Sequence, residues 1–378
     1  MTKSNTVPKV LHAHSTFAAG GKELRAVGLM NAFGDSIEHT VVSAEPDQLA
    51  ARELIDQGVK ANFPEEFPSL TGWPTPGRLV AIAQAMKPFD LVLTYNWGAM
   101  DAVLAHTVFA QALGLPPLVH HEDGFNEDEA NGLKKRRNWT RRVALGRTHK
   151  LVVPSRVLEQ IAHTVWMRPM GQIERIPNGI DTKAFGRKPD PNSLRLIKRE
   201  GERWVGTLAG LRPVKRLPML VEACAELPEN WHLVILGDGP ERDAIQIAAD
   251  ELEVSHRVHL LGAHSDPASL IGLFDIFALS SKSEQFPLSV VEAMAAGLPI
   301  AAPEVGDVRE IVSEANRPFV CSAHDTADLA RVIGELVANE ALRHDLGEEN
   351  RRKACAQFDA KAMIEAYRSL YWGAMGKA

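Results

Sequence analysis

Glu284 and Glu292 offer the most specific chemistry in this sequence. They lie in a segment that follows the apolar run Ile276–Leu279 and ends at Gly297, where a helix is expected to stop. Pro287 stands between them, at a position where the first turn of a helix tolerates proline. One carboxylate in the loop and one in the helix could hold the hydroxyls of a sugar and of a ribose, and the helix start could bind a pyrophosphate. Surface glutamates on an ordinary strand, loop and helix are the alternative.

Glycine pairs follow two of the apolar runs. Gly20 and Gly21 come after the run that begins near Val10, and glycine lets the backbone approach a phosphate without a clash from a Cβ atom. A plain turn is the simpler interpretation. Gly237 and Gly239 close another run, and we interpret them chiefly as a tight turn.

The elements that must position these residues alternate in type. Short apolar runs are separated by longer helical patterns, which is typical of α/β layers with parallel sheets. The expected strands are Lys9–Ala13, His39–Ser43, Leu91–Tyr95, Pro117–His121, Lys150–Pro154, Trp204–Leu208, His232–Leu236, Val258–Leu261, Ile276–Leu279 and Ile300–Ala302. Apolar residues recur at helical spacing in the first half, at Leu79, Ile82, Ala83 and Met86.

The chain has 378 residues, which is too long for one ordinary core and predicts two domains. Pro, Gly and Asn cluster at 176–181, the polar segment 186–192 follows, and the strand–helix rhythm then restarts. The boundary is therefore expected there. Two doubly wound sheets that face each other would leave a cleft between the carboxyl ends of their strands, where such sheets bind ligands.

Composition excludes several classes of protein. Hydrophobic residues make up 45% and charged residues 24%, which is typical of a folded globular chain, and a net charge of −6 argues against a nucleic-acid partner. The cysteines Cys224, Cys321 and Cys355 form no CxxC pair, so neither a disulfide framework nor a zinc site is indicated. No signal peptide and no apolar segment of membrane-spanning length is found, which predicts a cytoplasmic protein.

The segment from Glu284 to Pro299 resembles the Glu-x7-Glu motif of family 4 glycosyltransferases, which are retaining enzymes of the GT-B fold. Other segments resemble the same family in the same order: Gly20-Gly21-Lys22-Glu23, 176–181, Leu211 to Lys215, 237–240 and 305–312. The resemblance covers nearly the whole chain. It implies an α/β protein with two doubly wound Rossmann-like domains facing across a cleft, at 1–182 and 183–357. Residues 358–378 would form a helix that returns to the N-terminal domain.

The resemblance also implies roles for the site residues. Glu292 would bind the donor ribose, Glu284 the transferred sugar, and Lys215 the diphosphate, where charge develops on the leaving group. Backbone N–H groups of Phe286, Leu288 and Ser289 would meet sugar and phosphate, whereas Pro287 has none to donate. The resemblance implies two further roles less firmly. Gly20 and Gly21 would lie near the phosphate, and Leu261 would lie near the base.

Two departures from the family pattern concern charge and acid–base groups. Ala209-Gly210 stands where relatives often have Gly-Arg, so Arg212 is the candidate that supplies the missing charge. Asp123 aligns where many relatives place a histidine, and the sugar contact could instead fall to His120 or His121. Ordinary strand-end histidines are the alternative.

The reaction implied is transfer of a hexose-like sugar from a nucleotide-diphosphate sugar to a glycan or lipid-linked acceptor, in envelope polysaccharide or glycolipid synthesis. The chain has no Asp-x-Asp, so neither metal nor other cofactor is expected. An epimerase that uses His120, His121, Glu122 and Asp123, or an inactive sugar-binding subunit, are alternatives. A nicotinamide dehydrogenase is not, because no G-x-G-x-x-G lies between a strand and a helix.

The basic stretch Lys134–Lys150 contains apolar residues, among them Trp139, Val143 and Leu145. As a helix it could lie on an anionic membrane, which would make the protein peripheral at the inner face and suit a lipid-linked acceptor. A solvated helix that covers the sheet is the alternative.

At the C-terminus, the segment from Phe358 to Trp372 carries an apolar stripe: Met363, Ile364, Tyr367, Leu370 and Tyr371.

Overall fold

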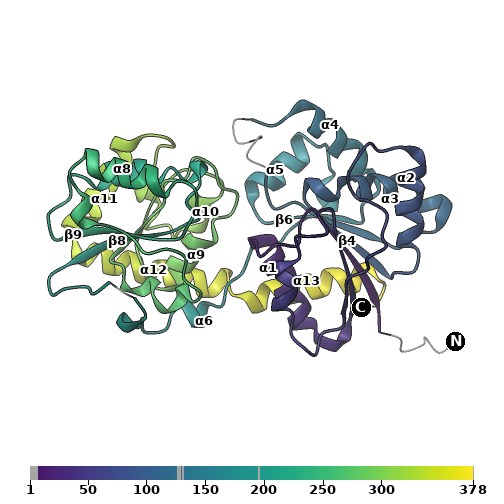
Figure 1. Ribbon diagram of the computed structural model, residues 1–378, viewed down its shortest axis with the longest axis horizontal. Helices are drawn as coiled ribbons and strands as arrows, with labels where there is room; N and C mark the ends of the chain where they lie inside the picture. The colour runs from purple at the N-terminus through teal and green to yellow at the C-terminus, as the bar shows by residue number, and fades with distance from the viewer. Residues whose placement is uncertain (1–6, 126–128, 130–131, 195, 378) are drawn as a thin grey trace. The chain divides into compact units, whose positions relative to one another are not determined.

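The structure is a computed structural model that describes residues 7–125, 129, 132–194 and 196–377. It divides into two compact units, Met1–Pro177 with Met363–Ala378, and Asn178–Ala362 (Figure 1). Each unit is a parallel sheet with helices packed on it. Both sheets are built from short apolar runs buried between helices, which is the pattern expected for parallel sheets covered on both faces.

The first unit contains a seven-stranded sheet with the order β3-β2-β1-β4-β5-β6-β7, and every neighbouring pair is parallel. Its strands are β1 (Lys9–His14), β2 (Glu38–Ser43), β3 (Ala61–Asn62), β4 (Leu91–Tyr95), β5 (Leu118–His121), β6 (Lys150–Val153) and β7 (Ile173–Arg175). Its helices are α1 (Gly21–Phe33), α2 (Pro76–Met86), α3 (Met100–Leu113), α4 (Lys135–Ala144) and α5 (Arg156–Thr164). The strand order reverses direction between β1 and β4, as in doubly wound sheets that bind ligands at this point.

Local signals explain where these elements begin. α2 starts at Thr75, whose Oγ1 accepts a hydrogen bond from the N–H of Arg78, and Pro76 occupies the first turn. The predicted apolar stripe of this helix is buried against the sheet. The predicted strands lie within one residue of their predicted ranges because the apolar runs that define them are continuous. The short strands Ala61–Asn62, Ile173–Arg175 and Val320–Cys321 were not predicted.

The second unit contains a six-stranded parallel sheet with the order β10-β9-β8-β11-β12-β13. Its strands are β8 (Arg203–Leu208), β9 (Trp231–Leu236), β10 (Val258–Leu260), β11 (Ile276–Ala278), β12 (Ile300–Pro303) and β13 (Val320–Cys321). Its helices are α6 (Thr182–Phe185), α7 (Leu217–Cys224), α8 (Arg242–Glu251), α9 (Leu288–Ala295), α10 (Val308–Ile311), α11 (Thr326–Ala338) and α12 (Glu340–Gln357).

The unit boundaries differ slightly from the predicted ones. The first unit ends at Pro177 rather than at residue 182, because Ile180 is buried in the core of the second unit and pairs with Asp359. Phe358 also belongs to that core, so the last helix, α13 (Ala360–Ala374), begins later than predicted.

α13 packs on the first unit. Tyr367 and Tyr371 are fully buried there, in a core cluster with residues of β1, β4 and α1. The other members of the predicted stripe pack against the same cluster. None of the helices that the structure describes is both long and apolar enough to cross a membrane.

Candidate functional site

Glu284 and Lys215 contact each other at the carboxyl edge of the second sheet. Glu284 lies in the loop between β11 and α9, and its Oε1 is 2.6 Å from Nζ of Lys215. The loop is held by a close approach of backbone, because a Cβ on Gly306 would lie only 2.4 Å from the carbonyl oxygen of Glu284. Gly306 also has φ of +53°, so a side chain there would be strained as well as blocked. Two residues predicted from separate motifs are therefore neighbours.

Lys215 ends the short 3-10 turn Pro213–Lys215, which is tied to the Glu284 loop by hydrogen bonds. Ser280 Oγ donates to the carbonyl of Lys215 at 2.8 Å, and the N–H of Lys282 donates to the carbonyl of Val214 at 2.7 Å. Arg212 lies exposed at the start of this turn, so its guanidinium is open to a ligand.

The glycines after β9 pack closely against the segment that carries Arg212 and Lys215. A Cβ on Gly239, where φ is +156°, would lie 2.5 Å from the carbonyl oxygen of Leu211. The N–H of Leu211 in turn donates to the carbonyl of Asp238. Gly237 and Gly239 thus form the turn that was expected, and they also bring it against the segment that carries Arg212 and Lys215.

Glu292 lies in the second turn of α9 and is half-buried. Burial raises the pKa of its carboxyl group to about 7. Among the residues that the structure describes, its carboxyl group has no hydrogen-bond or ion-pair partner. A half-buried carboxylate without a partner among the described residues is suited to bind hydroxyl groups of a ligand.

The beginning of α9 leaves backbone donors without partners inside the helix. Pro287 is the residue before the helix, and no side chain caps it, so the N–H groups of Leu288 and Ser289 lie in the first turn. Phe286 anchors this turn, with its ring edge-to-face against Phe358 at 5.6 Å between centroids. Its side chain therefore serves packing, and only its N–H is suited to a ligand.

Leu261 comes directly after β10, where its side chain packs against the core of the second unit and its N–H donates to the carbonyl of Ile235. The strand end continues into Gly262, whose carbonyl accepts from the N–H of Gly237. Backbone groups, rather than the leucine side chain, are what this position can offer to a base.

Gly20 and Gly21 lie where predicted, at the start of α1 after β1, and Gly20 is the residue before the helix. The following Glu23 is buried and accepts from Thr16 Oγ1, and its carboxylate is 2.7 Å from Nζ of Lys22. The contacts of Glu23 with Thr16 and Lys22 therefore hold the loop that contains Gly20 and Gly21.

Asp123 does not present a free carboxylate. Both of its oxygens bind the guanidinium of Arg25 from α1, one of them at 2.9 Å from Nη2, and its N–H donates to Oδ1 of Asn96. The sequence left the sugar contact open between Asp123, His120 and His121, and in the structure the carboxylate of Asp123 forms this bidentate pair with Arg25. Arg25 was missed because nothing in the local pattern links α1 to the end of β5.

His121 is fully buried and both ring nitrogens are engaged. Nδ1–H donates to the carbonyl of Thr94, so Nε2 is the acceptor for the hydroxyl of Tyr371 at 2.9 Å. Burial also holds the pKa of His121 well below the ordinary value of 6.5. His121 thus packs against α13, and its role at the site stays a prediction.

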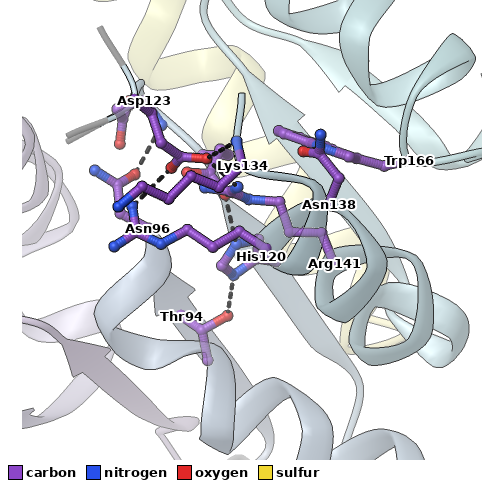
Figure 2. A network of polar contacts seen from close by, with 11 residues as sticks. Thr94, Asn96, His120, Asp123, Lys134, Asn138, Arg141 and Trp166 are labelled. Carbon is purple, nitrogen blue, oxygen red and sulfur yellow. Dashed lines mark hydrogen bonds and ion pairs between the residues drawn. The ribbon is translucent and has the colours of Figure 1, made fainter. Parts of the chain in front are cut away.

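The basic stretch divides between a buried ion network and the surface. Arg141 is fully buried, and its Nε donates to the carboxylate of Glu122 at 3.1 Å, while Glu129 lies 3.6 Å from Nη1 (Figure 2). His120 binds Thr94 Oγ1 at 2.7 Å and faces Glu122. Arg141 therefore cannot face a membrane.

Lys150 does not add to an exposed basic face of the stretch, because its Nζ donates to the carbonyl of Gly171 and to the carboxylate of Glu174. The exposed residues of the stretch are Lys134, Lys135, Arg136, Trp139, Arg142, Val143, Gly146, Arg147 and His149.

Comparison with known proteins agrees with this fold. Residues 19–184 match the model of "Glycosyltransferase Family 4", and residues 192–353 match that of "Glycosyl transferases group 1". Together the two matches cover most of the chain and place it in the class of GT-B glycosyltransferases. Within that class the chain belongs to family 4.

Individual relatives are more distant. The chain is 27% identical over 213 residues to N-acetyl-alpha-D-glucosaminyl L-malate synthase of Bacillus anthracis, a match that covers 54% of this chain and 55% of that one. It is 31% identical over 151 residues to the lipopolysaccharide core biosynthesis glycosyltransferase LpsE of Rhizobium meliloti, covering 40% and 44%. The matches thus span about half the length of these curated relatives. Among solved structures, Anabaena HepE in complex with UDP has a TM-score of 0.80 at 20% identity and covers 97% of this chain and 100% of that one.

Proposed function

We propose that this protein transfers a sugar, with retention of configuration, from a uridine-diphosphate sugar to a glycan or lipid-linked acceptor. The observation that carries the proposal is the contact between Lys215 and Glu284 beside the start of α9. The fold supports it further, because HepE, of the same fold, has been solved with UDP and with UDP-glucose. Synthesis of an envelope polysaccharide or glycolipid is the proposed setting, with LpsE as a relative in lipopolysaccharide core biosynthesis.

In the proposed reaction, the bond between the anomeric carbon and the diphosphate oxygen breaks while the bond to the acceptor oxygen forms on the same face. The acceptor proton passes to the departing diphosphate oxygen. Lys215 and the exposed Arg212 would stabilise the negative charge that grows on the diphosphate. Glu284 would hold hydroxyls of the transferred sugar, and Glu292 those of the ribose.

Backbone groups complete the proposed donor site. The N–H groups of Phe286, Leu288 and Ser289 at the start of α9 would meet the sugar and the phosphates, and backbone groups at Leu261 would meet the base. A phosphate contact at Gly20 and Gly21 stays a prediction.

Ligand binding tests the donor assignment directly. UDP at about 100 times its dissociation constant should add roughly 2.7 kcal/mol to the free energy of unfolding. GDP and ADP at the same concentration as UDP should add less. Lys215→Ala should lower turnover by about a hundredfold through loss of leaving-group stabilisation, while Lys282→Ala on the same loop serves as the control. Wild-type turnover in both Lys215→Ala and Glu284→Gln would refute the assignment.

We also propose that no metal ion takes part. The positive charges of Lys215, Arg212 and the start of α9 would replace one at the diphosphate. Transfer should then continue in EDTA, and loss of turnover that is restored by magnesium or manganese would overturn the proposal.

A second proposal concerns an anionic membrane surface, which the exposed face of α4 suits. Trp139 and Val143 lie one turn apart and are exposed, and Lys135 and Arg142 are exposed on the same helix. Vesicles that contain phosphatidylglycerol should bind the wild-type chain, and the binding should weaken with salt. Equal binding by a variant with Trp139→Ser, Lys135→Ser and Arg142→Ser would refute it. A cytoplasmic location at the inner face of the membrane stays a prediction.

A further inference from the structure

Two residues near Lys215 in the second unit have a backbone conformation that amino acids with a side chain rarely adopt. Arg216, which follows Lys215, has φ of +49° and ψ of +42°, and His324, in the loop between β13 and α11, has φ of +71°. Among the residues that the structure describes, five other than glycine have a positive φ, and these are two of the five. Such a conformation is disfavoured roughly 5–30-fold for a residue with a side chain, so other contacts must hold it.

Arg216 and His324 contact each other although 108 residues separate them in the chain. Nη1 of Arg216 donates to Nδ1 of His324 at 3.1 Å. A guanidinium can only donate, so Nδ1 is the acceptor and the hydrogen of the neutral imidazole lies on Nε2. Within the described part of the chain, this is the only hydrogen bond or ion pair that either side chain forms. The two strained residues therefore hold each other.

The backbone around Arg216 is also held. The peptide group between Lys215 and Arg216 is hydrogen-bonded at both ends: its carbonyl accepts from Oγ of Ser280 at 2.8 Å, and its N–H donates to the carbonyl of Pro213 at 3.2 Å. The carbonyl of Arg216 accepts from the N–H of Met219 at 3.0 Å, which holds the next peptide group. A rotation that returned Arg216 to the right-handed region would disturb these bonds.

The left-handed residue decides where Lys215 lies. Lys215 ends the 3-10 turn, and α7 begins at Leu217, which is buried in the core of the second unit. A right-handed backbone at Arg216 would let the turn run directly into α7, because helical residues lie on both sides of it. The left-handed residue interrupts this path. Lys215 therefore stays in the loop, where its Nζ is 2.6 Å from Oε1 of Glu284.

We propose that Arg216 is a positioning residue for Lys215 and that His324 holds it in its strained conformation. The contact fixes the backbone before the donor arrives, so that Lys215 does not have to be ordered at the moment of binding. Both residues would act through the backbone of Lys215 and not by contact with the donor. This inference rests on the proposed function, which places Lys215 at the diphosphate. It adds a role for two residues outside the donor motifs.

Glycine separates the effect of the backbone from that of the side chain, because it adopts the left-handed conformation without strain. Arg216→Ala removes the contact and keeps the strain, whereas Arg216→Gly removes both. Arg216 is half-buried and His324 is exposed, so these changes leave the core intact.

The measurement is the ratio of the affinities of the full chain for UDP and for uridine, obtained by calorimetry, because this ratio isolates the diphosphate contact. The ratio should fall about three- to tenfold in Arg216→Ala and in His324→Ala, since Lys215 then occupies the binding position for less of the time. In Arg216→Gly it should stay within about twofold of wild type.

A double variant gives the sharpest result. Arg216→Gly should restore the ratio that His324→Ala lowers, because glycine does not need the contact. Glu253 provides a matched control, since it also has a positive φ, of +58°, and lies exposed just after α8 in the same unit. Glu253→Ala and Glu253→Gly should leave the ratio unchanged. The affinity for uridine should be the same in all variants.

Three results would overturn the proposal. An unchanged ratio in Arg216→Ala and His324→Ala would show that the contact does not position Lys215. An equal loss in Arg216→Ala and Arg216→Gly would show that the guanidinium itself is needed, as in a direct contact with the diphosphate. A double variant that stays as low as His324→Ala would exclude the backbone as the link between the two residues.

Lys215→Ala separates a failure of this inference from a failure of the proposed function. If Lys215→Ala lowers the ratio while Arg216→Ala and His324→Ala do not, the donor assignment stands and the positioning role alone falls. If the wild-type chain does not bind UDP, or Lys215→Ala leaves the ratio unchanged, the placement of the diphosphate falls and the positioning role falls with it.

Discussion

Burial raises the pKa of Glu292 to about 7, so this carboxyl group changes charge near neutral pH. An ionised carboxylate accepts stronger hydrogen bonds from the hydroxyls of a ribose than its protonated form does. Its surroundings therefore make donor binding depend on pH.

UDP-glucose should bind up to about tenfold more tightly at pH 8 than at pH 6, because Glu292 is mainly ionised at the higher pH. UDP-glucose suits the calorimetric measurement because its diphosphate does not titrate in this range. Glu292→Gln should bind more weakly at pH 8 and show a flat profile. The same pH dependence in wild type and variant would dissociate Glu292 from the ribose.

Lys215 and Glu284 show how residue chemistry depends on the partner. Each neutralises the other at 2.6 Å, so the loop is stable without a ligand. A donor whose diphosphate competes for Lys215 would release the Glu284 carboxylate toward the sugar hydroxyls. The pair is thus suited to an exchange of partners on binding.

At the scale of elements, α4 is held by a buried charge. Arg141→Ala should lower the free energy of unfolding of the first unit by about 3–5 kcal/mol, because Glu122 would be left buried without its main partner. Arg142→Ala, one residue later on the exposed face, should change it by less than about 1 kcal/mol. Urea unfolding of both variants measures this, and equal effects would contradict the role of the network.

α13 offers a matched pair of tyrosines on one buried face. Tyr371 donates its hydroxyl to His121, so Tyr371→Phe should cost about 1–3 kcal/mol by leaving a buried acceptor unsatisfied. The buried hydroxyl of Tyr367 has no hydrogen-bond partner in the described structure, so Tyr367→Phe should be neutral or stabilising. Thermal unfolding tests both, and a larger loss for Tyr367→Phe would refute the assignment.

At the scale of the whole molecule, the two units respond to pH with opposite sign. In the first unit His12, His14, His39 and His121 are buried together, and burial lowers the pKa of each, that of His39 to about 4. His12 links the group, with Nε2 3.0 Å from His39 and Nδ1 3.1 Å from Tyr95. A lowered folded-state pKa gives stability that is present above about 6.5 and lost as the pH falls.

The first unit should therefore lose stability between pH 6.5 and pH 4, by about 3 kcal/mol from His39 alone. Glu292 acts in the opposite direction on the second unit, because its raised pKa favours the folded state most below about 4.5 and this advantage is lost as the pH rises through 7. Proteolysis of briefly unfolded protein, with fragments identified by mass spectrometry, separates the units. Equal resistance of residues 7–177 at pH 7.5 and pH 5, or no gain in acid resistance for His39→Gln, would contradict this.

The sequence by itself determined the α/β class, most of the strands, the stripe of α13 and the loop that carries Glu284. These follow from periodicity and from glycine and proline positions, which act between residues close together in the chain. The sequence could not predict which side chains would form hydrogen-bonded or ionic pairs. Arg25 meets Asp123 from 98 residues away, and Tyr371 meets His121 from 250.

The tertiary structure alone therefore decided which charged groups are free to act. In the structure Asp123, His121 and Arg141 are each engaged by a partner from another element. The structure left Glu292 with its carboxyl group unpaired among the described residues, although Glu292 and Glu284 look alike in the sequence. A residue's type states what chemistry it can perform, whereas burial and partners, which the packing of distant segments sets, decide whether it is available to perform it.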